Sequence, residues 1–353
     1  MRVGVLGTGA VGTRAARQLA LTADMEVFVS DEDPVAARRV ADALGQNVMA
    51  VTTVVGLDDL DAVVIATPTP QAEFAERFVR AGVPVVSTTD DPGDAGDLYA
   101  LDDLAAERGV LVVVGAGFAP GLSCLLARHG SHELDRVDEI HVARHGTGGP
   151  ACARQHHHSL GGTARWWRDG DWIEQPAGSG RELCWFPDPI GAYDCYRAEM
   201  ADPLLLRRAF PSASRISART SGTRRDRLTA RLPMLRPPHP EGAIGAIRVE
   251  LRGTRAGMRE TVVFGAIDRA AVAAGAVAAV AALLVAPAAP SPGLARHAGE
   301  PALAPPSGDG PSGRLVGAHS LAAKGIDVAA VLAELASRGV KAARFTGGHG
   351  PGW

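Results

Sequence analysis

The strongest constraint on the fold is a glycine-rich turn that follows directly on the first apolar run of the chain. Residues 2–6 are mostly apolar, and the turn Gly-Thr-Gly-Ala-Val-Gly occupies residues 7–12. A helical pattern continues to residue 20, and a second apolar run over residues 25–29 ends at Ser30 and Asp31. This order of strand, glycine turn, helix, strand and acidic residue is typical of a βαβ unit that opens a parallel sheet.

Each glycine of this turn has a role that a side chain would prevent. Gly7 permits the sharp turn off the strand, Gly9 lets the backbone approach a pyrophosphate, and Gly12 lets the helix pack closely on the strand. The helix then directs its free N–H groups and positive dipole end at the phosphates. Asp31 lies 19 residues after Gly12, where a carboxylate accepts hydrogen bonds from both ribose hydroxyls of an adenosine. We predict dinucleotide binding here; the alternative is a purely structural glycine turn.

Apolar runs and helical patterns alternate over the first 128 residues. The apolar runs lie at residues 48–53, 61–66, 83–86 and 110–114, and the helical patterns at 35–44, 71–81 and 98–108. Strands that are apolar on both faces indicate a parallel sheet covered by helices on both sides. The fold class is therefore α/β, a Rossmann doubly wound parallel sheet.

Ligands of such sheets bind at the carboxyl ends of the strands. The residues at these ends are the predicted cofactor contacts: Gly7, Thr8, Gly9, Ala10, Val11, Gly12, Asp31, Thr67, Pro68, Thr88, Gly115 and Gly117. For residues 115–121, a tight strand–helix connection is the structural alternative. Asp31 favours NAD over NADP because its charge would repel a 2′-phosphate, although Arg38 and Arg39 follow closely enough to accept NADP.

Residues 1–128 resemble the saccharopine dehydrogenase-like group of reductases. The resemblance depends on the glycine turn, on Thr67-Pro68 after the fourth strand, and on Gly117, Pro120 and Gly121 after the sixth. It implies an NAD(P)-dependent oxidoreductase that moves a hydride between nicotinamide and an amine/imine or carbonyl carbon of an amino-acid-like, carboxylate-bearing substrate. Sugar-oxidising relatives usually carry Glu-Lys-Pro after the fifth strand. This chain reads Ser-Thr-Thr-Asp over residues 87–90 instead, which argues against that group.

The rest of the chain divides into four further segments. Residues 129–267 alternate like half-exposed strands, including a less clear one at 228–232, and predict an α+β domain with a mixed or antiparallel sheet that binds substrate. The resemblance implies that this sheet also supports a homodimer. Residues 268–289 predict a helix returning to the Rossmann domain, 290–313 a Pro/Gly-rich connector, and 314–353 a helix and strand packing on the Rossmann domain.

Composition excludes several classes of protein. The chain has 353 residues, 46% of them hydrophobic, and a net charge of −3, which gives no reason to expect nucleic acid. Residues 270–289 carry no charge, but they are mostly alanine, so we expect a buried helix and no membrane span. The first strand begins at the N-terminus, which leaves no targeting segment and predicts a cytoplasmic protein whose four cysteines are reduced.

The second domain holds the candidate catalytic and substrate-binding residues, which are chosen by residue type and not by a family motif. Histidines titrate near neutrality and suit proton transfer, and arginines hold carboxylates through two parallel hydrogen bonds. The catalytic candidates are His156, His157, Tyr193 and Asp194. The substrate-binding candidates are Arg154, Arg181, Arg197 and Arg224. For both sets the alternative is ordinary packing and solvated charge, and we expect no metal, because Cys152 and His156 lack a second ligand pair with zinc spacing.

Two other functions remain open from the sequence. The first is a non-catalytic dinucleotide-binding redox sensor, which needs the Rossmann domain but no organised second pocket. The second is an aldehyde dehydrogenase that uses Cys152 as its nucleophile.

Overall fold

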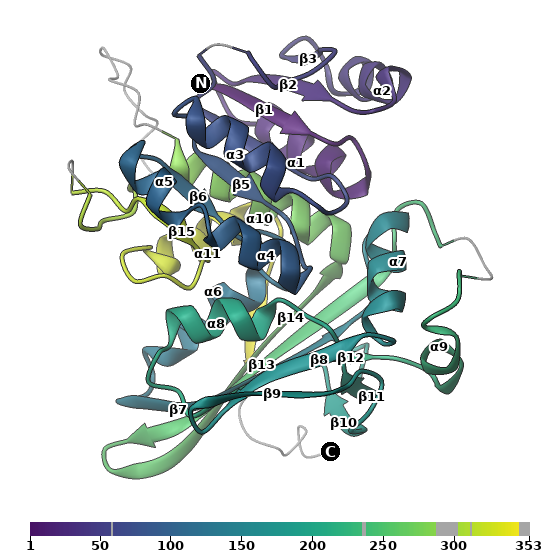
Figure 1. Ribbon diagram of the computed structural model, residues 1–353, viewed down its shortest axis with the longest axis vertical. Coiled ribbons are helices and arrows are strands. Elements are labelled where there is room, and N and C mark those ends of the chain that lie inside the picture. The colour runs from purple at the N-terminus through teal and green to yellow at the C-terminus, as the bar shows by residue number, and fades with distance from the viewer. Residues whose placement is uncertain (58, 235–237, 287–302, 311–312, 346–353) are drawn as a thin grey trace.

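Two β-sheets, one in each half of the molecule, organise the computed structural model (Figure 1). The structure describes residues 1–57, 59–234, 238–286, 303–310 and 313–345. The first sheet is parallel throughout, in the order β15-β6-β5-β4-β1-β2-β3. Its strands are β1 (Arg2–Leu6), β2 (Glu26–Ser30), β3 (Val48–Ala50), β4 (Ala62–Ile65), β5 (Val85–Ser87), β6 (Leu111–Val113) and β15 (Gly317–His319). The doubly wound parallel Rossmann sheet predicted from the sequence is confirmed, and β15 adds a seventh strand.

Helices cover both faces of this sheet, and they are α1 (Ala10–Ala20), α2 (Pro34–Leu44), α3 (Ala72–Arg80), α4 (Pro92–Tyr99), α5 (Asp102–Glu107) and α10 (Ala270–Val285). The helix α10 contacts α1 and strands β4 to β6. A Cβ on Gly275 would lie 2.5 Å from the Cβ of Arg14, so the small residues of α10 allow the two helices to approach closely. This burial explains why an uncharged alanine-rich segment belongs to a core. No helix within the described residues is both long and apolar enough to cross a membrane.

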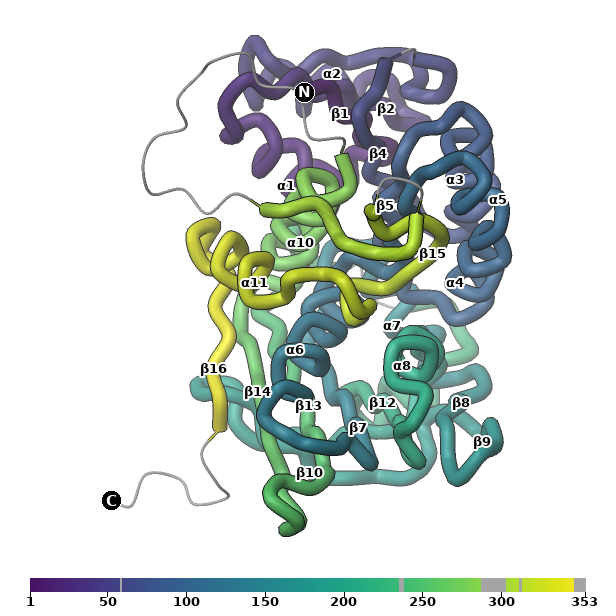
Figure 2. Tube along the Cα trace, turned by 90° about the vertical axis from the view of Figure 1, so that its left-hand side faces the viewer, coloured from purple at the N-terminus to yellow at the C-terminus, as the bar shows by residue number. Residues whose placement is uncertain are grey.

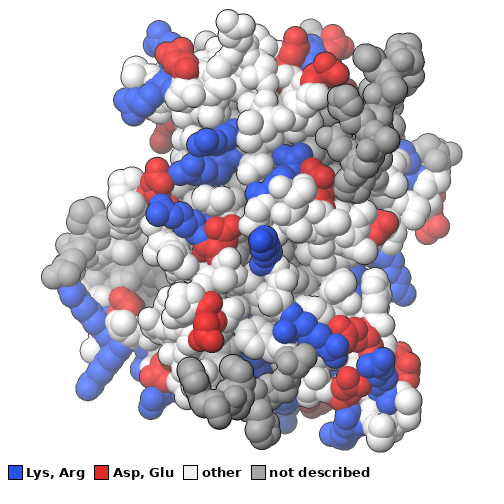
Figure 3. All heavy atoms as spheres, turned by 180° about the vertical axis from the view of Figure 1, so that it is seen from behind, with Lys and Arg blue, Asp and Glu red and all other residues white. Residues whose placement is uncertain are grey.

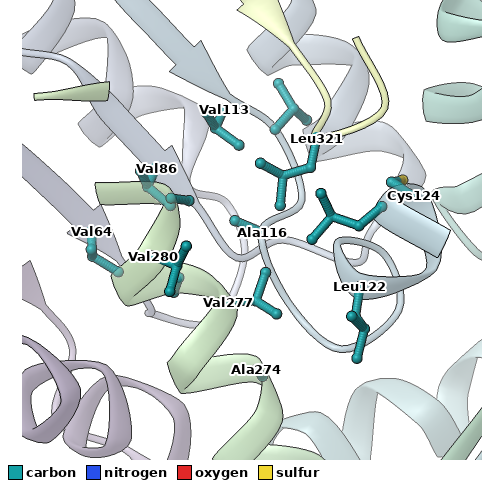
Figure 4. Close-up of a cluster of buried hydrophobic side chains, with 14 of the residues drawn as sticks. Val64, Val86, Val113, Ala116, Leu122, Cys124, Ala274, Val277, Val280 and Leu321 are labelled. Atoms are coloured by element: carbon teal, nitrogen blue, oxygen red, sulfur yellow. The ribbon is translucent and has the colours of Figure 1, made fainter. Parts of the chain in front are cut away.

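The core of this domain lies between α10 and the sheet. Val64, Val86 and Val113 point from three neighbouring strands toward Val277 and Val280 of α10 (Figure 4). All five side chains are almost fully buried. The C-terminal segment closes this cluster through Leu321, and α11 (Val328–Ser337) packs outside α10.

The second sheet is mixed and follows the order β10-β11-β12-β7-β13-β14-β16, with the β8–β9 hairpin beside β12. Its strands are β7 (Arg136–His145), β8 (Thr163–Arg168), β9 (Asp171–Pro176), β10 (Glu182–Trp185), β11 (Ala192–Arg197), β12 (Arg215–Ser221), β13 (Ile244–Arg255), β14 (Met258–Arg269) and β16 (Ala342–Phe345). Only β7 and β12 pair in parallel among the described strands of this sheet. Its inner face is covered by α6 (Leu122–Ser131) and α8 (Asp202–Ala209).

Three expectations differ from the structure. The expected helix over residues 98–108 is two helices, α4 and α5. The first of them begins earlier than expected, at Pro92, because the Asp91 side chain caps it there. The expected strand at 228–232 is wrong: Thr223 and Asp226 form a capping box, which starts the helix α9 (Arg224–Thr229). The tail does not pack on the Rossmann domain alone, because β16 pairs with β14 of the second sheet (Figure 2). Most of the connector expected at 290–313 lies outside the described residues.

Acidic and basic side chains alternate over the surface seen in Figure 3. Several charged side chains of the protein form ion pairs, including Arg14–Glu241 at 2.8 Å and Arg344–Glu133 at 2.7 Å. The first pair joins α1 to the loop before β13, and the second joins β16 to the end of α6. These pairs connect segments that lie far apart in the sequence.

Candidate functional site

The glycine turn has the geometry that close approach of a phosphate chain requires. Gly7 has a φ of +96°, and a Cβ there would lie 2.7 Å from the carbonyl oxygen of Ala66. A Cβ on Gly12 would lie 1.9 Å from the carbonyl oxygen of Gly7. At Gly9, by contrast, no heavy atom of the described residues lies within 4 Å of the Cβ position. The turn is therefore tight on its inner side and open above Gly9, at the N-terminus of α1.

Asp31 at the end of β2 is held by the same turn. Its Oδ2 accepts hydrogen bonds from the Thr8 amide at 2.6 Å and the Thr8 hydroxyl at 2.8 Å, and its Oδ1 accepts from the Asp33 amide at 3.0 Å. Partial burial disfavours its charge, but these hydrogen bonds outweigh burial and lower the pKa of Asp31. The lowered pKa keeps Asp31 charged. A carboxylate has about four acceptor sites, and three of them are used here, so one site is left for a ribose hydroxyl. Contact of Asp31 with both ribose hydroxyls stays a prediction from the sequence.

A cleft with an empty volume of about 940 Å³ lies between the two domains. One wall is formed by the segments that follow β4, β5 and β6, and it includes Thr67, Pro68, Thr88 and Gly117. The other wall comes from the loop after β7 and from α7 (Pro150–Ser159), which rises from the second sheet (Figure 1). Val11 of the glycine turn also lines the cleft. The cleft therefore begins at the predicted dinucleotide site and ends in the second domain.

Gln71 fixes the Rossmann wall of this cleft, and sequence reasoning missed it. Its side-chain amide donates to the carbonyl oxygen of Thr67 at 2.6 Å, and its Oε1 accepts from the Ser87 hydroxyl at 2.7 Å and the Thr88 amide at 3.1 Å. The residue is 2% exposed. One buried amide thus ties together the ends of β4 and β5. The hydroxyl of Thr67 is buried in the same wall without a hydrogen-bond partner among the described residues.

Arg144 joins the two domains at the cleft, and sequence reasoning missed it too. Its Nη1 donates to Oδ2 of Asp90 at 2.9 Å and to the carbonyl oxygen of Ala119 at 3.1 Å. Its side chain is 9% exposed and that of Asp90 is 27% exposed. A strand of the second sheet is thereby joined to the segments after β5 and β6. The sequence signal that could have found it is its place directly after the alternating pattern of residues 137–143.

A second, more open hollow continues the cleft over Gly146 and His156, which line both. His145 lies in this hollow, where its Nδ1 is 2.9 Å from the Ser221 hydroxyl and its ring is 4.1 Å from the ring of Tyr193. Burial lowers the pKa of His145, so the imidazole is neutral near pH 7. Tyr193 and Asp194 also line this hollow, so with His156 the structure brings three of the four catalytic candidates to one place.

The three consecutive histidines of α7 point in different directions. His156 faces the cleft, but its Nε2 is bonded to the carbonyl oxygen of Ser221 at 3.1 Å and its Nδ1 to the Thr220 hydroxyl at 3.2 Å. Burial, followed by the charge of Arg144, lowers the pKa of His156 to about 3. His157 is buried away from the cleft, with its Nε2 directed at two carbonyl oxygens around α9. The position of His157 therefore gives a structural role and does not support the predicted catalytic one.

The predicted substrate arginines are not gathered at the cleft. Arg154 and Arg224 are exposed on α7 and α9. Arg197 lies over the ring of Trp166, 4.7 Å from its centroid. Only Arg181 lines the hollow, and it forms a 2.8 Å ion pair with Asp194. Of the four candidates, Arg181 is therefore the one that lies beside Tyr193 and Asp194 in this hollow, and its role in carboxylate binding stays a prediction.

Cys152 lines the cleft, but its environment disfavours a nucleophilic role. Burial and the nearby charge of Asp90 raise the pKa of Cys152 to about 11. The thiolate is the reactive form of cysteine, and a thiol with this pKa is protonated at neutral pH. The arrangement speaks against the aldehyde dehydrogenase alternative. No cluster of three or more His, Cys, Asp or Glu side chains suited to a metal is found among the residues that the structure describes.

The lowered pKa of His156 predicts a loss of stability in acid. Its pKa is about 3 in the folded protein and about 6.5 in the unfolded chain, so between these values only the unfolded state binds the proton. The stabilisation that comes from keeping His156 neutral is complete above about pH 6.5. As the pH drops from there toward 3, the free energy of unfolding falls by up to about 1.4 kcal/mol for each pH unit. Measured by urea unfolding, the free energy of unfolding should differ less between pH 7 and pH 5 for His156→Gln than for the wild type. The exposed His158→Gln is the control, and equal differences for all three proteins would contradict the prediction.

Comparisons with known proteins agree with this geometry. A family model described as NADP oxidoreductase, coenzyme F420-dependent, matches residues 2–91. Inositol 2-dehydrogenase of Rhizobium meliloti (strain 1021) is 42% identical over 84 residues, which are 23% of this chain and 26% of that protein. The chain thus matches about a quarter of the length of this curated relative.

A solved structure matches almost the whole chain. It is apo saccharopine dehydrogenase (L-Glu forming) from Saccharomyces cerevisiae, with a TM-score of 0.65 and 16% identity over 98% of this chain and 100% of that one. The likeness covers both the parallel sheet and the mixed sheet. The protein therefore has the two-domain fold of saccharopine dehydrogenase, with an N-terminal Rossmann domain.

Proposed function

We propose that this protein is an NAD-dependent oxidoreductase that transfers hydride between nicotinamide and an amine/imine or carbonyl carbon of an amino-acid-like substrate. The observation that carries the proposal is the cleft that runs from the glycine turn to the second domain. The turn fits a dinucleotide: the space above Gly9 is open, and the charged Asp31 keeps one acceptor site. When bound, the dinucleotide supplies the hydride carrier.

The residues of the chain have distinct tasks in this proposal. The Rossmann wall, held by Gln71, positions the nicotinamide end, and the opposite wall from α7 excludes water from the reacting carbons. Substrate occupies the adjoining hollow, where Arg181 holds a carboxylate. His145 accepts or returns the proton, because it is neutral and its Nδ1 is oriented by Ser221. Homodimer formation and a cytoplasmic location stay predictions from the sequence.

Cofactor binding is the first test. NADH should bind at least about tenfold more tightly than NADPH, because the charge of Asp31 opposes a 2′-phosphate. Arg38 and Arg39 line a separate hollow on the outer side of α2 together with Asp42. Titration of the intrinsic fluorescence with each nucleotide measures both affinities, and Asp31→Asn should narrow the difference. Binding of neither nucleotide would remove the proposal, and a preference for NADPH would overturn the role of Asp31.

Turnover is the second test. NADH oxidation is followed with pairs of 2-oxo acids and amines, and in reverse with NAD and amino-acid derivatives. Once a substrate is found, His145→Gln should lower kcat at least about tenfold while the Kd for NADH is unchanged. His158→Gln provides the matched control on an exposed face of α7. A protein that binds NADH without turning over any pair would favour the redox-sensor alternative.

A further inference from the structure

The outer face of the second sheet holds a polar hollow that the proposed oxidoreductase function does not use. It has an empty volume of about 660 Å³ and is lined from strands β7, β10, β12 and β13. Four arginines and two glutamates line it: Arg215, Arg219, Arg248, Arg252, Glu182 and Glu250. The arginine excess makes the hollow electropositive. Its lining also includes Cys184 of the edge strand β10.

Cys184 has a second thiol beside it. In the antiparallel pairing of β10 and β11, Cys184 lies opposite Tyr193 and Cys195 lies opposite Glu182. The two cysteines are therefore diagonal neighbours on the same face of the sheet. They share one small apolar cluster with Phe186, and the Cys195 thiol is hydrogen-bonded to the Cys184 sulfur. Neither forms a disulfide in the structure.

We propose that Cys184 is a reactive thiol, with Cys195 as its resolving partner, and that hydroperoxides convert the pair to a disulfide. Three features favour this. Cys184 is 7% exposed and borders the hollow, whereas Cys195 behind it is fully buried. Arg219 and Arg248 supply positive charge at the same hollow, which is the environment of reactive cysteines. The strand β10 lies at the edge of the sheet, so it can move toward β11 without disturbing a second neighbour.

Electrostatics support the same order of reactivity. The hydrogen bond from Cys195, together with the smaller effects of Arg219 and Arg248, outweighs burial and the charge of Glu182 and lowers the pKa of Cys184. The same hydrogen bond, followed by burial, raises the pKa of Cys195. The other two cysteines have the opposite environment, because burial raises the pKa of Cys152 to about 11 and that of Cys124 to about 12. Cys184 is thus the thiol that reaches the thiolate form most easily.

The oxidation is balanced with hydrogen peroxide as the oxidant. The Cys184 thiolate attacks one peroxide oxygen, the O–O bond breaks, and the departing hydroxide takes a proton to become water. This leaves a sulfenic acid on Cys184. The Cys195 sulfur then attacks the Cys184 sulfur, the S–O bond breaks, and the hydroxyl leaves as water with the Cys195 proton. Two thiols and one peroxide give one disulfide and two waters.

Reactivity is measured on the full-length reduced protein by a short iodoacetamide pulse, followed by unfolding and peptide mass spectrometry. Cys184 should be alkylated at least about tenfold faster than Cys152 and Cys124, which act as internal controls. Arg219→Met should slow the reaction of Cys184, while Arg259→Met, an exposed change on β14, should not. A Cys184 rate no higher than that of Cys152 overturns the proposal.

Oxidation is measured separately with equimolar hydrogen peroxide. The wild type should form an intramolecular Cys184–Cys195 disulfide that dithiothreitol reverses. In Cys195→Ala the reaction should stop at a Cys184 sulfenic acid that dimedone traps, and Cys184→Ala should form neither product. Absence of the crosslink, or oxidation first at Cys152, overturns the proposal. Neither readout requires a substrate or cofactor, so the result is independent of the proposed oxidoreductase activity.

Discussion

Replacing Gly12 by alanine is expected to lower both the stability of the protein and its affinity for NADH. A Cβ at residue 12 would lie 1.9 Å from the carbonyl oxygen of Gly7 and 2.9 Å from its carbon. Both atoms belong to the backbone, so the turn itself must shift. Overpacking of this kind costs about 1–3 kcal/mol, and the displaced turn can no longer present the N-terminus of α1 to phosphates. Urea unfolding and NADH titration measure the two losses.

Gly9→Ala separates binding from stability. Gly9 has φ −67° and ψ −170°, a conformation that alanine adopts without strain, and the described residues leave its Cβ position open. The variant should unfold like the wild type but bind NADH at least about tenfold more weakly, a loss of about 1.4 kcal/mol. Gly96→Ala is the matched control, because its Cβ position on α4 is equally open within the described structure but lies outside the crevice. If Gly9→Ala and Gly96→Ala bind NADH equally well, the dinucleotide does not cross the turn at Gly9.

The Rossmann half was predictable because its signals are local. Gly7 and Gly12 are five residues apart, and the positive φ of one and the close approach of the other are consequences of the same turn. Each apolar run of the parallel sheet is buried on both faces, so its composition alone predicts a strand. The boundary errors, as at α4, arose where a capping residue such as Asp91 decides where a helix begins.

The contacts across the cleft were not predictable from residue type. Arg144 and Asp90 are 54 residues apart, and they meet only because the two domains pack against each other through helices such as α6, α8 and α10. The histidines show the opposite failure. The three consecutive histidines suggested a catalytic role. Successive residues of a helix point in different directions, however, so His157 is buried in the domain and His158 is exposed. His145 lies at the end of β7 beside the cleft, a position that its residue type alone does not indicate.

Replacing Arg144 by alanine is expected to have the largest effect of any substitution outside the glycine turn. It removes the donor to Asp90 and to the carbonyl oxygen of Ala119, and it leaves Asp90 without its ion-pair partner in the wall of the cleft. Removing one partner of a buried ion pair costs about 3–5 kcal/mol of stability. Asp90 keeps 27% of its side-chain surface exposed, so the cost here should lie at the lower end of that range. We expect a loss of about 3 kcal/mol in the free energy of unfolding, measured by urea titration.

The double variant Arg144→Ala/Asp90→Asn shows whether the loss comes from the uncompensated charge. It should recover part of the stability lost in Arg144→Ala, since the neutral amide no longer requires a cation. Arg144→Lys should fall between the wild type and Arg144→Ala, because lysine keeps the charge but not the planar guanidinium whose Nη1 contacts both acceptors. Arg136→Ala is the control on the same strand, where the Arg136–Asp138 pair is exposed and should contribute little. An Arg144→Ala variant as stable as Arg136→Ala would show that the two domains do not depend on this pair for their contact at the cleft.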